Sequence, residues 1–151
     1  MGPERAQRLI ASLELGRRLA RGIAEGKPLI EEPAAAAALV EYELDGARKE
    51  TVKSILLDTR NRVMEVTTVS VGSLDSSIVH PREVFAEAVR AGAAAVILAH
   101  NHPSGDPTPS AEDRAVTTRL VEAGRILGVE FLDHIVVGGG RWVSLKEIGW
   151  M

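Results

Sequence analysis

The chain has 151 residues, 45% of them hydrophobic and 26% charged, so it is long enough for one domain with a sizeable core and too short for two. It contains no cysteine, which excludes disulfide bonds and zinc sites built on thiolates, so a metal site in this chain must use histidine and carboxylate. The net charge of -3 is unevenly divided, with +3 on residues 1–27 and -6 on residues 28–151, and the overall charge of the larger part argues against a nucleic-acid surface.

The first segment predicts an amphipathic helix over residues 4–21. Apolar residues recur there at helical spacing between arginines: Leu9, Ile10, Leu13, Leu19 and Ala20. The arginines interrupt the apolar stretch that a secretory signal needs, and the longest apolar run, residues 93–99, is far shorter than the ~20 residues of a membrane span. We therefore expect a cytoplasmic protein without membrane contact. The basic face of this helix is either a solvated surface or a contact for DNA phosphates.

The segment "GIAEGKPLIEEP" predicts a linker, because two glycines and two prolines interrupt the helical pattern. We therefore expect a basic helix with its linker over residues 1–27 and a second unit over residues 28–151. Helical patterns in the second unit cover residues 33–46, 80–92 and 111–127, and β-branched or continuous apolar runs predict strands over 50–58, 62–72, 93–99 and 131–145. The last run holds two strands around a glycine-rich hairpin turn, Gly138 to Gly140. This order predicts an α/β fold with a mixed sheet flanked by helices.

The stretch "AHNHPSGDPTPSAED" carries the residues best suited to chemistry. His100 and His102 stand two apart at the end of a strand, and such side chains project to the same side, so both imidazoles can converge on one ion. Prolines in the loop favour a fold that brings Ser110 and Asp113, at the start of the next helix, back over the histidines. Two imidazoles and one carboxylate make a three-ligand zinc set with an open fourth position, which is typical of a catalytic site.

A simpler interpretation accounts for two of these residues without metal. The Ser-x-x-Asp spacing of Ser110 and Asp113 resembles a capping box, in which the serine caps the helix and the acid favours its positive end. It does not account for the two histidines, and capping is compatible with metal binding. His80 and His134 lie outside the pattern and are expected to be structural.

The same stretch resembles the JAMM (JAB1/MPN) motif, His-x-His, seven residues, Ser, two residues, Asp. The resemblance implies a cytidine-deaminase-like α/β fold, a Zn²⁺ ion on His100, His102 and Asp113, and Ser110 as the donor to the oxyanion. It also implies a glutamate general base on the first strand of the core, and the matching residue in "KETVKSILLD" is Glu50. Other carboxylates stay open for that role: Glu65, Glu112 and Asp133.

Longer matches, "VGSLDSSIVHPREVFAEAVRAGAAAVILAHNHPSGDPTPS" and "LDHIVVGGGRWVSLKEIGW", resemble the bacterial RadC branch of this family. RadC-like chains carry a helix-hairpin-helix segment before this domain, and "GPERAQRLIASLELGRRLA" resembles only its tail, so we expect most of that segment to be missing. The resemblance implies a zinc metallopeptidase that cleaves a peptide or isopeptide bond, with a nominal link to DNA repair and an unidentified protein substrate. The alternative is a zinc-stabilised scaffold or DNA-associated binding module without turnover.

Overall fold

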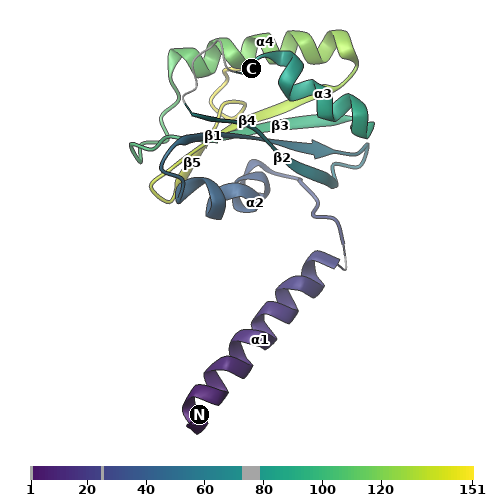
Figure 1. The fold of residues 1–151 in the computed structure, drawn as a ribbon. Helices are drawn as coiled ribbons and strands as arrows, with labels where there is room; N and C mark the ends of the chain where they lie inside the picture. Colours follow the sequence, from purple (N-terminus) through teal and green to yellow (C-terminus); the bar gives the residue numbers. More distant parts are fainter. Residues whose placement is uncertain (1, 25, 73–78) are drawn as a thin grey trace.

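A five-stranded mixed sheet with helices on both faces forms the body of the computed structural model, which describes residues 2–24, 26–72 and 79–151 (Figure 1). The strands lie in the order β2-β1-β3-β4-β5. Their bounds are β1 (Glu50–Leu57), β2 (Val63–Gly72), β3 (Ala95–Asn101), β4 (Glu130–Gly138) and β5 (Arg141–Ser144). The predicted α/β class and mixed sheet are therefore confirmed.

The pairing of β1 with β3 brings two distant segments together at one end of the sheet. These two strands are antiparallel and pair Val52 with His100, so the beginning of β1 lies beside the end of β3. On its other side β3 pairs in parallel with β4, where His100 is opposite Val136. Glu50, the first residue of β1, therefore starts its strand next to the histidines.

Helix α2 (Pro33–Asp45) covers one face of the sheet, and α3 (Pro81–Ala91) and α4 (Ala111–Leu127) cover the other (Figure 1). Alternating strand residues form two apolar clusters, as expected for a sheet buried on both faces. The cluster under α2 includes Val40, Leu44, Ile55, Ile97 and Ile135. The cluster under α3 and α4 includes Phe85, Val52, Leu98, Val116 and Leu120. Because β3 contributes to both clusters, its carboxyl end is held in a rigid part of the molecule.

The central strand begins two residues later than its apolar run predicts, and it ends at Asn101, one residue beyond the expected end at His100. Ala93 does not belong to it, because its N–H donates to the carbonyl of Ala88 and closes the end of α3 beyond the left-handed Gly92. At the other end, His100 and Asn101 continue the ladder by pairing with β4. His100 thus belongs to the strand, as expected, and its side chain is completely buried.

Helix α1 (Pro3–Ala24) is longer than the predicted segment 4–21, and it projects away from the sheet (Figure 1). Its apolar stripe is exposed where the structure describes it, with 51% of Leu9, 65% of Ile10 and 61% of Leu13 accessible to solvent. The side chains of Leu19 and Ala20 lie outside the described part. Among the helices that the structure describes, none has the length and apolar character needed to span a membrane.

Candidate metal centre

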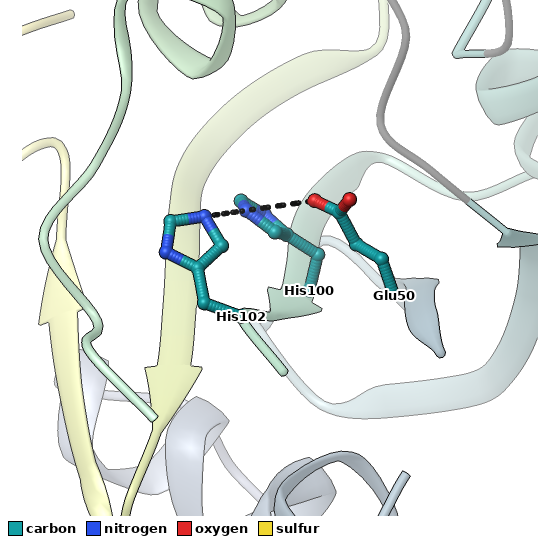
Figure 2. A group of neighbouring side chains, drawn as sticks. All are labelled: Glu50, His100 and His102. Carbon is teal, nitrogen blue, oxygen red and sulfur yellow. Dashed lines mark hydrogen bonds and ion pairs between the residues drawn. The ribbon is translucent and has the colours of Figure 1, made fainter. Parts of the chain in front are cut away.

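The rings of His100 and His102 face each other at the end of β3. The Nε2 atoms of His100 and His102 are 3.1 Å apart, and Figure 2 shows both rings with the carboxylate of Glu50 beside them. His102 follows the strand directly, and its backbone N–H donates to the carbonyl of Val137 at 2.8 Å. The side chain of His102 remains partly accessible, whereas that of His100 is fully buried. One histidine is therefore set in the core and the other at the rim of the site.

Asp113 reaches the histidines from the first turn of α4. Ser110 caps this helix, because its Oγ accepts from the N–H of Asp113 at 3.1 Å while Asp113 Oδ2 accepts from the N–H of Ser110 at 2.6 Å. The predicted capping box is thus confirmed. The same carboxylate places Oδ1 3.2 Å from His100 Nε2 and Oδ2 3.4 Å from His102 Nε2. Capping thus holds the carboxylate in a position that faces both rings, so the cap is compatible with a metal site.

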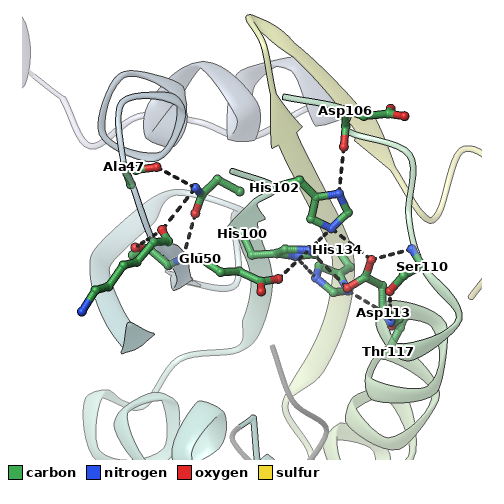
Figure 3. Close-up of polar contacts among 12 residues, drawn as sticks. Ala47, Glu50, His100, His102, Asp106, Ser110, Asp113, Thr117 and His134 are labelled. Atoms are coloured by element: carbon green, nitrogen blue, oxygen red, sulfur yellow. Dashed lines mark hydrogen bonds and ion pairs between the residues drawn. The ribbon is translucent and has the colours of Figure 1, made fainter. Parts of the chain in front are cut away.

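Glu50 approaches from the opposite side, at the start of β1. Its Oε1 lies 4.0 Å from His100 Nε2, and its side chain is 18% exposed. The ligand atoms of Glu50, His100 and His102 all lie within 4.8 Å of one another, so this group can hold a metal ion. The structure therefore brings all five residues singled out in the sequence to one place (Figure 3).

The donor atoms can be compared with the spacing that a tetrahedral ion requires. A tetrahedral zinc ion with bonds of about 2.0–2.1 Å separates neighbouring ligand atoms by about 3.3–3.4 Å. The Nε2 atoms of His100 and His102 are 3.1 Å apart. Asp113 turns a different oxygen to each ring, with Oδ1 3.2 Å from His100 Nε2 and Oδ2 3.4 Å from His102 Nε2, whereas Glu50 Oε1 lies 4.0 Å from His100 Nε2. Both carboxylates thus lie within reach of the two imidazoles, and Asp113 is the nearer of the two.

The site places a negatively charged carboxylate beside the two imidazoles, as binding of a cation requires. Burial opposes ionisation of Asp113, but contacts with His100 and His102 outweigh it, and the pKa of this carboxyl lies well below its usual range. In return, the Asp113 carboxylate raises the pKa of His102 above its ordinary value of 6.5. The site therefore contains a buried anion that attracts either protons or a metal ion to the imidazoles.

The remaining ring nitrogens of the two histidines are also bound. His102 Nδ1 lies 2.8 Å from the carbonyl oxygen of Asp106, and His100 Nδ1 lies 2.8 Å from Nε2 of His134 (Figure 3). A carbonyl only accepts, so the proton of neutral His102 is on Nδ1 and its Nε2 carries the lone pair. Such outer contacts orient the histidines of metal sites.

The loop that carries these residues rests on the β4–β5 hairpin. A Cβ placed on Gly139 would lie 2.6 Å from the carbonyl oxygen of Gly105, and Gly139 has a φ of +58°. Only glycine satisfies both conditions. On the other side of the hairpin, both oxygens of Asp45 accept from the N–H of Gly140 at 3.2 Å. The glycines form the predicted hairpin turn, and they also let the loop pack closely against the hairpin.

The other carboxylates considered from the sequence lie elsewhere. Glu65 is exposed and pairs with Leu56, near the far end of β1, and Glu112 is exposed on the first turn of α4. Asp133 is buried among donors, accepting from Ser144 Oγ at 2.6 Å, and burial raises its pKa. Each therefore has a surface or structural position.

The two histidines outside the motif have different environments. His80 caps α3, because its Nδ1 accepts from the N–H of Arg82 at 3.1 Å. His134 touches His100, and burial lowers its pKa well below the ordinary value. Sequence reasoning missed this contact and also missed Thr117 and Asn101. Thr117 lies one helical turn after Asp113, which is the one signal that would have placed it near the site.

The chain is similar to known proteins over most of its length. A family model described as RadC-like JAB domain matches residues 30–150. The chain is 51% identical over 149 residues to a UPF0758 protein of Chloroflexus aurantiacus, covering 99% of this chain and 65% of that relative. It is 53% identical over 147 residues to a UPF0758 protein of Moorella thermoacetica, covering 97% of this chain and 64% of that relative. It therefore spans about 65% of the length of these curated relatives, and the region matched by the model contains every candidate site residue.

Proposed function

This chain belongs to the family of RadC-like JAB domains, and from that premise we propose that it is a zinc-dependent hydrolase that cleaves a peptide or isopeptide amide bond. One observation carries the proposal: the Nε2 atoms of His100 and His102 are 3.1 Å apart, and the Asp113 carboxylate places one oxygen within 3.4 Å of each, which is close to the spacing of zinc ligands. A carboxylate that lies beyond ligand spacing and a serine beside the third ligand add the groups that hydrolysis needs.

His100, His102 and Asp113 would hold the ion. Bound by three protein ligands, zinc supplies Lewis acidity toward water and toward a substrate carbonyl. The two histidines contribute neutral donors, and the buried carboxylate of Asp113 offsets part of the charge of the ion. A purely structural site needs four protein ligands, whereas this set leaves a fourth position for the reaction.

Glu50 is the proposed general base. Its Oε1 is 4.0 Å from His100 Nε2, and the partial exposure of its side chain gives water access to it. The carboxylate takes a proton from the attacking water as the new C–O bond forms. It then passes this proton to the amine nitrogen as the C–N bond breaks, so one carboxylate serves as base and then as acid.

Ser110 is the proposed donor to the oxyanion. Its Oγ already accepts a hydrogen bond from the N–H of Asp113, which uses one lone pair and leaves the hydroxyl hydrogen to be donated elsewhere. The capping box holds this hydroxyl next to the ligands through the backbone of α4. The hydrogen can therefore turn toward the negative charge that develops on the carbonyl oxygen.

The test combines metal content with turnover. Wild-type protein, Glu50→Gln, His102→Ala and Asp113→Asn are analysed for zinc and assayed on pools of peptides and isopeptide-linked peptides. We expect about one zinc per chain in wild type and in Glu50→Gln, loss of zinc in the two ligand variants, and cleavage only by wild type. Glu112→Gln, which makes the same change at an exposed neighbouring acid, is the control and should behave as wild type.

Two outcomes contradict this proposal in different ways. If wild-type protein stays free of metal at neutral pH when zinc is supplied without chelator, these residues do not form a zinc site. Zinc retained without cleavage of any amide would instead support the alternative, a zinc-stabilised scaffold or DNA-associated binding module.

A further inference from the structure

His134 is completely buried on β4, directly behind the candidate ligand His100. Both of its ring nitrogens are engaged: Nε2 lies 2.8 Å from His100 Nδ1, and Nδ1 lies 2.7 Å from the Oγ1 of Thr117 (Figure 3). Neither nitrogen is available to an ion. His134 thus has no place among the ligands, and the motif that predicts the ligands does not explain why a second histidine is buried there.

Thr117, the last residue in this series of hydrogen bonds, determines which atom donates in each of them. Thr117 Oγ1 lies 2.7 Å from the backbone carbonyl oxygen of Asp113. A carbonyl oxygen can only accept, so the single hydroxyl hydrogen of Thr117 is donated to it. The contact between Thr117 and His134 therefore requires the proton to be on His134 Nδ1.

The same reasoning passes through the ring of His134 to the ligand. Neither of these two hydrogen-bond partners of the His134 ring is a carboxylate, and a completely buried imidazole is disfavoured as the cation, so His134 carries one proton only, on Nδ1. Its Nε2 must then accept from His100, which places the proton of His100 on Nδ1. The Nε2 atom of His100, which faces Asp113 and His102, is left with its lone pair.

We propose that His134 and Thr117 are positioning residues, which fix the tautomer of His100 with its proton on Nδ1 and so present its Nε2 to the metal ion. The part that concerns the ion rests on the proposed function, whereas the order of the protons does not. The hydrogen bonds form a path from the backbone of one ligand, Asp113, through Thr117 and His134 to a second ligand, His100. The start of α4 and the end of β3 are linked by this path.

Loss of the Thr117 hydroxyl has a defined consequence. The proton of His134 would have no acceptor on the Nδ1 side, and it could move to Nε2, which faces His100. His134 would then donate to His100 Nδ1, and the proton of His100 would occupy Nε2, the position that the ion needs. Binding would have to reverse this arrangement, and changes in such outer contacts typically weaken metal binding by about 10–100-fold.

Zinc affinity of three threonine variants tests the proposal, measured by competition with a chromophoric chelator. Thr117→Val removes the hydroxyl with little change in shape, and we expect a loss of about 10–100-fold. Thr118→Val is the matched control, because Thr118 makes the same type of bond, to the carbonyl of Arg114 at 3.0 Å, on the exposed side of α4. Thr118→Val and Thr117→Ser should both bind as wild type does. Thermal unfolding would check that both valine variants are folded. Equal zinc affinities for folded Thr117→Val and Thr118→Val would overturn the proposal.

A second measurement decides the order of the protons without metal. Long-range proton–nitrogen NMR of the imidazoles is recorded on wild-type protein from which a chelator has removed the metal, at a pH above the ordinary histidine pKa. It should show His100 and His134 protonated on Nδ1. A proton on Nε2 of His134 would overturn the inference even if zinc binds. If wild-type protein binds no zinc, the proposed function fails, and the NMR result still supports or overturns the hydrogen-bonded path.

Discussion

The side chain of Asn101 accepts a hydrogen bond from the backbone N–H of Thr51 at 2.7 Å. Its amide nitrogen lies 3.3 Å from the carbonyl oxygens of both Ala47 and Lys49. The residue between the two histidines therefore binds the backbone on both sides of Glu50. One tripeptide at the end of β3, residues 100–102, thus supplies two candidate ligands and fixes the strand that carries the candidate base.

We expect Asn101→Ala to slow amide cleavage by about 10–100-fold while zinc content stays at the wild-type level, since a small displacement of Glu50 disturbs its alignment with water. The ligands lie on other side chains and should keep their positions. The comparison is between kcat and bound zinc, both measured below the unfolding temperature of the variant. Loss of zinc with unchanged kcat per bound ion would show that Asn101 supports the ligands instead.

Alanine substitutions at Gly139 and Gly140 distinguish backbone strain in the hairpin turn from the contact between the hairpin and the loop. Both glycines have positive φ, +58° and +68°, so alanine costs about 1–2 kcal/mol at either position. Only at Gly139 would the new Cβ also strike the carbonyl of Gly105. Gly139→Ala should therefore lower the free energy of unfolding more than Gly140→Ala and should weaken zinc binding, as measured by denaturant titration and chelator competition. Equal effects of the two substitutions would mean that the loop does not depend on this contact.

Local features of this protein were predictable from sequence, because they depend on residues close together in the chain. The helix from Ala111 to Leu127, its capping box and the convergence of His100 with His102 are of this kind. The contact between His100 and His134 depends on β4 lying beside β3, and that order is set by the packing of the whole sheet. Residue spacing carries no information about it.

The same limit applies to α1. The periodicity of Leu9, Ile10 and Leu13 correctly predicts a helix, because helical spacing is a local property. It does not determine what those side chains pack against, and in the described residues they are exposed. Amphipathic spacing alone therefore does not show that the helix joins the core.

DNA contact through the N-terminal basic helix remains a proposal, and it predicts a salt-dependent affinity. Arg5 and Arg8 are exposed on α1, within a segment of net charge +3. If both bind phosphates, replacing them with glutamine should reduce the slope of log K against log salt by about 2. Removal of residues 1–27 should abolish the affinity. Binding to duplex DNA is followed by fluorescence anisotropy at several salt concentrations, and an affinity unchanged by either alteration would exclude this helix as the contact.

The pH dependence of zinc binding follows from the pKa of His102. The Asp113 carboxylate raises this pKa above 6.5, and a proton on Nε2 competes with the ion for the same lone pair. Asp113 itself stays ionised throughout this range, because its pKa is strongly lowered. Zinc affinity should therefore increase with pH up to the raised pKa of His102 and become constant above it.

The stability of the metal-free protein should fall as pH rises and His102 loses its proton, whereas zinc affinity increases over the same pH range. A pKa that is higher in the folded state than in the unfolded state stabilises the fold below the unfolded pKa, and this contribution is lost as pH rises through the folded pKa. The difference in Tm between zinc-loaded and chelated protein should therefore grow with pH. Because the charge of Glu50 also raises the pKa of His102, Glu50→Gln should keep the zinc ligands and move the midpoint of this growth to lower pH. A midpoint below 6.5 in wild type, or one that Glu50→Gln moves upward, would contradict the role of the two carboxylates in setting the charge of His102.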